Sequence, residues 1–416
     1  MVSTNDISPV KTSERFVILD ALRGFALLGI CMANFPEFSL YTFLSLEAVA
    51  AMPTAVADTI TRYLLYIFVD GKFYTLFSLL FGIGFSIIIR NAERKGTNGF
   101  RIFYRRMGML LLFGFLHLMF IWSGDILMLY ALLGILLPLF RRISDKKLLG
   151  WALFFLILPI AMDGVCEMTH TNLALPFIHL QDTYCAKYGI NEANFAYWLH
   201  DAEDYGTVFQ FLVQGACVRM QEFIIGNRYF KVLGLFLIGF YIGRNRIYAN
   251  LEGRRNLLVK AFRWGLTLGL PYSLLYAWSS MSGHPFGNTL HSVCYFISVY
   301  PLGFAYASGL CLLYLKWKEG SIWKWLAAPG RMALTNYLGQ SVIGMFLFYG
   351  IGLGWGSTIG LLQTEVIVLA VFLFQMLFSR LWLSGFRFGP LEWIWRMLTY
   401  GKWLKIKDTG TCPPVV

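Results

Sequence analysis

The chain has 416 residues, of which 57% are hydrophobic and only 14% are charged. Soluble domains carry about 25% charged residues, so this chain cannot cover a water-facing surface. The composition therefore excludes a soluble enzyme, a disordered scaffold and a DNA-binding module. We expect an all-α fold, a polytopic membrane helical bundle.

The net charge of +12 is distributed unevenly along the chain. Six basic regions, with the termini beside them, hold 29 of the 35 Lys and Arg but only 9 of the 23 Asp and Glu. These regions are 11–23, 90–106, 141–147, 244–263, 316–331 and 380–407. Basic loops remain on the cytoplasmic side of a membrane. The pattern predicts both termini in the cytoplasm and requires no nucleic-acid partner.

Apolar runs long enough for a bilayer span predict about ten transmembrane helices. In chain order they are 17–36, 73–89, 107–122, 126–140, 148–163, 229–243, 262–280, 291–315, 332–351 and 357–379. Asp20 and Arg23 interrupt the first run, so we expect an anchor and not a cleaved signal peptide. The half-apolar stretch 52–69 suits an interfacial helix or a re-entrant segment.

The predicted spans divide into two halves around a hydrophilic insertion. Residues 1–163 form a five-span half with the candidate active site, 164–228 an extracytoplasmic loop that we expect to be partly helical, and 229–416 a second five-span half. The second half ends in an interfacial cytoplasmic helix, for which Pro390 suits the first turn. One disulfide among Cys166, Cys185 and Cys217 remains open.

The candidate catalytic centre is His117, which lies in an unambiguous span and, roughly 16 Å of helix rise beyond Arg106, in the outer half of the membrane. A tight turn at Ser123 and Gly124 places Asp125 at the mouth of the hairpin, and Tyr130 can then face His117. A carboxylate beside a buried imidazole suits a general base. Lys72 would lie nearby. The alternative is that neighbouring groups form hydrogen bonds with a purely structural His117, and that Asp125 caps the next helix. Asp125 can orient His117 and cap the helix at the same time.

Arginines at the predicted cytoplasmic side are candidates for binding phosphate groups, because the guanidinium fork is bidentate. They are Arg23, Arg105, Arg106 and Arg331. Arg23 can also form an i, i+3 pair with Asp20, which would leave it a simple anchor. Further along, Thr335, Asn336, Gln340 and Ser341 are too polar to face lipid, so they should face a wet cavity or bond other helices. We include Asn336 in the candidate binding site.

Other chemistries find no support in the sequence. The glycine-rich 350–356 joins two apolar runs and is interpreted as a turn. Nucleotide-loop, serine-hydrolase and zinc-protease motifs are missing, and the loop histidines lack metal-ligand spacing. We expect no metal.

Several segments together resemble the YeiB-like bacterial membrane proteins, a family of unknown function. They are Leu19-Asp20-Ala-Leu-Arg23-Gly24 with Asn34, Lys72-Phe-Tyr-Thr-Leu-Phe-Ser-Leu-Leu-Phe-Gly82, Leu116-His117 with Gly124-Asp125 and Tyr130, Gly330-Arg331 to Asn336-Tyr337, and Phe388-Gly-Pro390 to Arg396. The resemblance covers nearly the whole chain outside 164–228 and implies the bacterial inner membrane.

A looser similarity, in the start of the first span and the Phe-rich second span, extends to the transmembrane acyltransferases. That group includes the heparan glucosaminide N-acetyltransferase and bacterial O-acetyltransferases. In several of them the catalytic His lies on or just after the first span; here that region has Asn34, and His117 is the candidate. The similarity implies transfer from cytoplasmic acyl-CoA, the donor substrate, to an envelope sugar or lipid acceptor.

Two other functions stay open at this point. The same cavity could serve a transporter or flippase for an anionic small molecule or lipid, or the chain could be a non-catalytic partner that docks through 164–228. Membrane lipids are expected partners in each case, and a homo-oligomer is left open.

Overall fold

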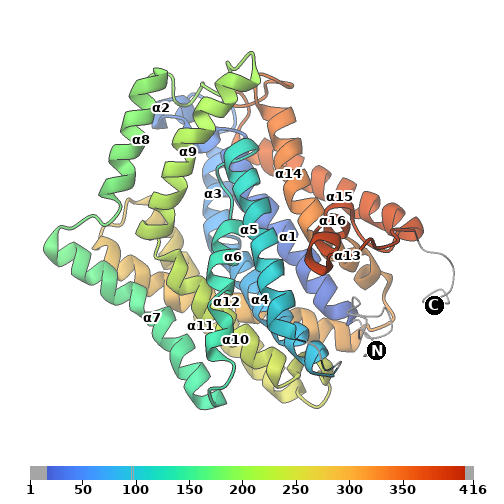
Figure 1. The fold of residues 1–416 in the computed structure, drawn as a ribbon. Coiled ribbons are helices and arrows are strands. Elements are labelled where there is room, and N and C mark those ends of the chain that lie inside the picture. The colour runs from blue at the N-terminus through green and yellow to red at the C-terminus, as the bar shows by residue number, and fades with distance from the viewer. Residues whose placement is uncertain (1–15, 95, 97, 408–416) are drawn as a thin grey trace.

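The computed structural model describes residues 16–94, 96 and 98–407, and this part of the chain folds into helices without a β-strand. Cys412 and the two chain termini lie outside the described residues. The first half contains α1 (Val17–Phe38), η2 (Tyr41–Phe43), α2 (Leu46–Ala50), α3 (Ala55–Phe68), α4 (Lys72–Arg94), α5 (Gly99–Phe120), α6 (Leu127–Gly134), η3 (Leu137–Phe140) and α7 (Asp145–Thr169). Figure 1 shows these helices assembled with those of the second half into one bundle.

The remaining helices begin with two that form much of the predicted insertion. They are α8 (Leu175–Tyr188), α9 (Tyr205–Ile225), α10 (Arg228–Arg244), η4 (Ile247–Ala249), α11 (Arg255–Met281), α12 (Gly287–Lys316), α13 (Ser321–Arg331), α14 (Ala333–Phe348), α15 (Leu361–Gly385) and α16 (Pro390–Tyr400). The insertion is partly helical, and the last helix begins at Pro390, as predicted.

Short polar side chains begin several helices by accepting hydrogen bonds from otherwise unpaired backbone N–H groups. Asn98 caps α5 by accepting from the amides of Phe100 and Arg101, and Asp204 caps α9 by accepting from Thr207. These caps fix where the apolar helices start.

Length and composition make six helical segments of the described chain able to cross a membrane. They are α1, the 55–94 segment of α3 and α4, α5, α7, α12 and α15, and they overlap six of the ten predicted spans. The pair α9 and α10, bent by 64°, is a seventh if it counts as one span. The described part of the chain is therefore all-helical and has the apolar helices of a membrane protein.

The other predicted spans are less regular. The 126–140 run folds as the short helices α6 and η3, and the 332–351 run folds as α14, whose 16 residues rise roughly 24 Å, less than a hydrocarbon core of about 30 Å. The 262–280 run lies inside the long α11. The half-apolar stretch 52–69 becomes α3, which leads directly into α4.

The predicted basic loops meet at one end of the bundle, called here the basic end. Arg141 lies 4.2 Å from the ring centroid of Phe100, and Arg90 donates to the carbonyl of Gly243 at 2.6 Å. Phe16, the first described residue, packs against Tyr248. At the opposite end, Ser357 N–H donates to Ser39 O at 2.8 Å and Gly350 N–H to Leu199 O at 2.9 Å. The 350–356 segment is thus a loop that packs on the 164–228 insertion.

At the contact between α4 and α10, glycines let the two backbones meet. An added Cβ at Gly239 would overlap the carbonyl of Leu79, and one at Gly82 would overlap the carbonyl of Phe236. Small residues of this kind allow close helix packing in membranes. This contact holds the helices that carry one wall of the cavity described below.

Replacing Gly239 by Ala should destabilise the protein by about 1–3 kcal/mol, because the new methyl group meets backbone that cannot rotate away. Denaturant unfolding of the detergent-solubilised protein measures the change. The matched control is Gly84→Ala on α4, where an added Cβ has no neighbour within 4 Å and Ala favours the helix. Equal stability of the two variants would contradict the role of this contact.

Candidate functional site

A cavity of about 1490 Å³ is lined by residues from the basic end, the middle and the opposite end of the bundle. Cations at the basic end are Arg23, Arg106, Arg331, Arg387 and Arg396. The middle is mainly apolar and aromatic: Tyr74, Phe77, Phe81, Met107, Leu110, Leu127 and Tyr130. The opposite end is rich in charge: Glu37, Asp70, Asp163, Arg219, Glu222, Arg228 and Lys231. Such a cavity suits an elongated amphiphile.

Three of the four predicted donor-binding arginines line this cavity at the basic end. Arg23 donates to Asp20 at 2.7 Å, which confirms the predicted pair, and the Arg106 guanidinium lies 4.2 Å from the ring centroid of Trp395 on α16. Arg331 is the third, and α16 adds Arg396. Arg105 is exposed and is not a lining residue.

Asn336 is also predicted as a binding residue, and it lies outside the cavity lining. Its buried amide donates to the Pro329 carbonyl at 3.2 Å and to the Ser379 hydroxyl at 2.9 Å. The side chain thus joins α13, α14 and α15, the helix–helix alternative that the sequence left open.

A carboxylate from α16 caps the start of α14 beside the cavity. Glu392 accepts from the amides of Leu334 and Thr335 at 2.7 and 3.1 Å and from the Thr335 hydroxyl at 2.6 Å. Burial raises the pKa of the Glu392 carboxyl above its ordinary value, and these donors act in the opposite direction. The contact fixes the interfacial helix against the bundle.

The predicted pair of His117 and Asp125 is confirmed, and a third residue joins it. His117 Nδ1 lies 2.8 Å from Asp125 Oδ1, and His117 Nε2 lies 2.8 Å from the hydroxyl of Ser341 on α14. Next to an ionised Asp125, which only accepts, Nδ1 would donate; in the neutral tautomer that this requires, Nε2 accepts from Ser341. The second Asp125 oxygen accepts from the amide of Met128 at 2.8 Å, so the carboxylate also caps α6.

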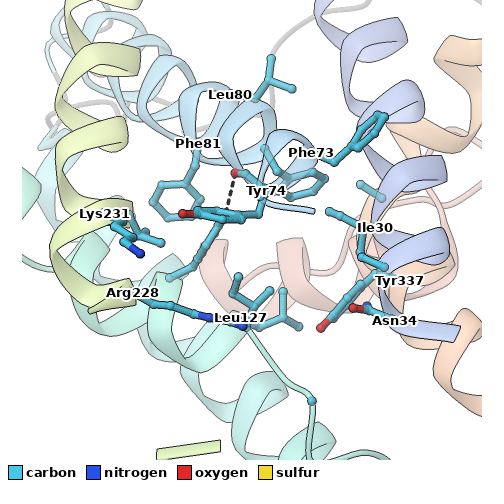
Figure 2. A pocket seen from close by; sticks show the side chains of 18 of the residues that line it. Ile30, Asn34, Phe73, Tyr74, Leu80, Phe81, Leu127, Arg228, Lys231 and Tyr337 are labelled. Carbon is cyan, nitrogen blue, oxygen red and sulfur yellow. Dashed lines mark hydrogen bonds between the residues drawn. The ribbon is translucent and has the colours of Figure 1, made fainter. Parts of the chain in front are cut away.

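All three groups are buried and none is a lining residue of the cavity. The link is Tyr337, one helical turn before Ser341. Its ring lies 5.3 Å from the imidazole of His117 and also lines the cavity, where Figure 2 shows it beside Asn34. The hydrogen-bonded chain therefore stands one aromatic ring away from the cavity.

The other two predicted catalytic residues lie elsewhere. The hydroxyl of Tyr130 faces the cavity wall on α4 and is within 2.6 Å of the Ser78 hydroxyl. Lys72 is fully buried, with its ammonium 2.6 Å from the carbonyl of Tyr66 and 5.1 Å from the ring centroid of Tyr276. Lys72 thus stabilises the α3–α4 junction and does not contact His117.

Some residues of the site were not predicted for it. Ser341 was recognised as an interior polar group, but not as the partner of His117. Arg228 and Lys231, which line the opposite end of the cavity, stand where the insertion gives way to the sixth predicted span; their only sequence signal is a pair of cations beside an apolar run. Among the described residues, Cys166, Cys185 and Cys217 stand as free thiols.

The fold and the cavity define a helical integral membrane protein with a buried His-Asp-Ser chain. The chain is 33% identical to the "Uncharacterized protein YxaH" of Bacillus subtilis, over 97% of this chain and 98% of that protein. It is 29% identical to the "Uncharacterized protein YeiB" of Escherichia coli, over 93% and 96% of the two chains. The protein therefore belongs to the YxaH and YeiB family.

Two further comparisons agree with this assignment. The family model described as "Protein of unknown function (DUF418)" matches residues 242–402. An "Uncharacterized 39.9 kDa protein in amylase 3'region" of Bacillus acidopullulyticus is 30% identical, over 95% of this chain and 97% of that protein. No solved structure matches the chain.

Replacing Asp125 by Ala should destabilise the protein by about 1–3 kcal/mol for each buried donor that it leaves without an acceptor, namely His117 Nδ1–H and the Met128 amide. Asp125→Asn retains an acceptor oxygen and should cost less. Unfolding in detergent measures both changes.

The control is Asp201→Ala, which removes the carboxylate from a solvent-exposed His-Asp pair, 2.6 Å apart, at His200. This change should be nearly neutral, because exposed pairs contribute little. Equal losses at Asp125 and Asp201 would show that the buried chain does not stabilise the fold.

Proposed function

We propose that this protein is a membrane-embedded acyltransferase of the bacterial inner membrane. It takes an acyl group from cytoplasmic acyl-CoA at the basic end and passes it to an envelope sugar or lipid at the opposite end. The observation that carries the proposal is the chain Asp125–His117–Ser341, which stands one ring from a cavity with lining residues at both ends. A base that is oriented by a carboxylate and hydrogen-bonded to a hydroxyl is the arrangement that acyl transfer uses.

The basic end suits the donor. Arg23, Arg106 and Arg331 line the cavity there, and arginine forks bind phosphate oxygens through paired, charge-assisted hydrogen bonds. The thioester and acyl chain would extend into the apolar, aromatic middle of the cavity towards Leu127 and Tyr337.

In the transfer step, the acceptor oxygen bonds to the thioester carbonyl carbon as the carbon–sulfur bond breaks. His117 Nε2 takes the proton from the acceptor hydroxyl and returns it to the departing CoA sulfur, so that the products are an ester and free CoA thiol. The Ser341 hydroxyl marks the place at Nε2 that the acceptor hydroxyl would take. Asp125 holds the ring in the required tautomer and stabilises its protonated form, and access to the cavity requires movement of the Tyr337 ring.

The proposal includes ten spans with both termini in the cytoplasm. The meeting of the basic loops at one end of the bundle supports this topology, because such loops remain cytoplasmic. The short helices α6–η3 and α14 would then count as spans although neither covers the full hydrocarbon core. One end of each would contact neighbouring protein instead of lipid.

Topology reporters check the ten-span arrangement. Alkaline phosphatase fused after Gly189 should be active, because that enzyme matures only outside the cytoplasm, whereas a fusion after Asn250 should be inactive. A fluorescent protein, which folds in the cytoplasm, should give the reverse result. Activity of both phosphatase fusions would overturn the topology.

Purified protein should release CoA thiol from acyl-CoA when lipid extract supplies acceptors, and His117→Ala should lower that rate by about 10²–10⁴-fold, the usual contribution of a general base. Acyl-CoA binding should persist in this variant. Arg106→Gln should instead weaken donor binding, and its exposed neighbour Arg105→Gln provides the matched control. Thiol release that survives His117→Ala would rule out this mechanism.

A second function has one observation in its favour. Because lining residues come from both ends of the bundle, the cavity also fits a transporter or flippase for an anionic molecule. That function predicts movement of a labelled lipid across vesicles without thiol release and without dependence on His117.

A further inference from the structure

The helix break between α9 and α10 lies at the charged end of the cavity. The two helices meet at 64°, and Asn227 at the junction has a left-handed backbone with φ of 48°. Its side-chain amide donates to Asp163 on α7 at 2.8 Å. The break is therefore anchored to a neighbouring helix, and the first turn of α10 has a fixed direction.

The first turn of α10 carries two cations, Arg228 and Lys231, on the cavity wall. Figure 2 shows both side chains among those around the chamber that also contains Tyr74 and Tyr337. Lys231 is only 8% exposed, and its ammonium lies 4.0 Å from the ring centroid of Tyr295. In the described part of the chain, neither cation makes a hydrogen bond or an ion pair.

The carboxylates near these cations already form hydrogen bonds or ion pairs with other groups. Asp163 accepts from Asn227 and Ser292, and Asp70 accepts from the hydroxyl of Tyr276. Glu222 pairs with Arg219. A guanidinium has five N–H donors and an ammonium three, so the wall presents unused donors beside acceptors that already have partners. A buried cation in this state favours an anionic ligand.

The helix terminus adds to this preference. No side chain caps the first turn of α10, and the N-terminus of a helix carries a partial positive charge that favours anions. Broken helices in membrane proteins direct such termini at anionic substrate groups. Two cations and a helix terminus together suit an oxyanion with more than one charged oxygen.

We propose that Asn227, Arg228 and Lys231 form an anion pocket, which binds the phosphate group of a molecule held at this end of the cavity. The apolar wall beside it, with Phe81 and Leu127, would receive the rest of that molecule. That this phosphate compound is the acyl acceptor rests on the proposed function; the pocket itself does not. The phosphate can belong to a lipid headgroup or to a soluble ester, and the ligands tested below separate the two sources.

Calorimetric titration of the full-length protein in detergent tests the pocket with three probes: inorganic phosphate, glycerol 3-phosphate and dioctanoyl phosphatidic acid. At least one should bind. Removal of a charged hydrogen-bond donor should weaken binding about tenfold for each cation. The variants are Arg228→Gln, Lys231→Gln and their combination.

The matched control is the double variant Lys260→Gln with Arg263→Gln, an i, i+3 pair of exposed cations on α11 outside the cavity lining. It should bind like the wild type. Lys231→Met, which removes the charge and keeps an unbranched side chain, replaces the double Gln variant at the pocket if that variant fails to fold.

Binding of phosphatidic acid alone would assign a lipid headgroup, and binding of glycerol 3-phosphate or inorganic phosphate would assign a soluble phosphate. Failure of all three probes to bind, or binding that is unchanged in the folded pocket variants, would overturn the proposal. The titration contains no acyl donor. It therefore tests the anion pocket independently, and its result would stand even if the acyltransferase proposal failed.

Discussion

The hydrogen bond between His117 and Ser341 is the interaction on which the candidate site depends. It joins residues that are 224 positions apart and that belong to different halves of the chain. Polar groups in an apolar interior are costly unless each has a partner, so Asp125, His117 and Ser341 fix one another and with them the packing of α5 against α14. The position of Tyr337 follows, because it lies on the same helix one turn from Ser341.

The local part of this site could be predicted from the sequence, and the long-range part could not. Asp125 follows His117 across a single tight turn, so their contact depends on the geometry of a hairpin. Which helix supplies the third group depends on how distant helices pack, and no periodicity encodes that. The sequence also did not show which of two adjacent arginines faces the cavity. Successive helix positions point about 100° apart, so Arg106 lines the cavity while Arg105 is exposed.

The helical class was evident from composition, but the sequence did not separate α9 from the hydrophilic segments before it. Residues 205–225 fall within the predicted hydrophilic insertion 164–228, and they include Gln214, Arg219 and Glu222. In the structure they form α9, which leads into α10 as a bent pair, and Gln214 and Arg219 are buried. A helix that turns polar side chains towards protein and a cavity needs less apolar surface than one surrounded by lipid. Polar residues within such a run therefore do not exclude a helix inside the bundle.

The glycine contact between α4 and α10 has a mechanical consequence. The two backbones are in direct contact at Gly82 and Gly239, with no layer of side chains between them that could rearrange. We therefore expect α4 and α10 to move as one unit and not to slide past each other. Tyr74, Phe81, Arg228 and Lys231, which these helices carry into the cavity, consequently act as one rigid surface. Any change in the width of the cavity must then come from movement of the helices on its other side, opposite α4 and α10. The protein resembles a clamp with one fixed jaw.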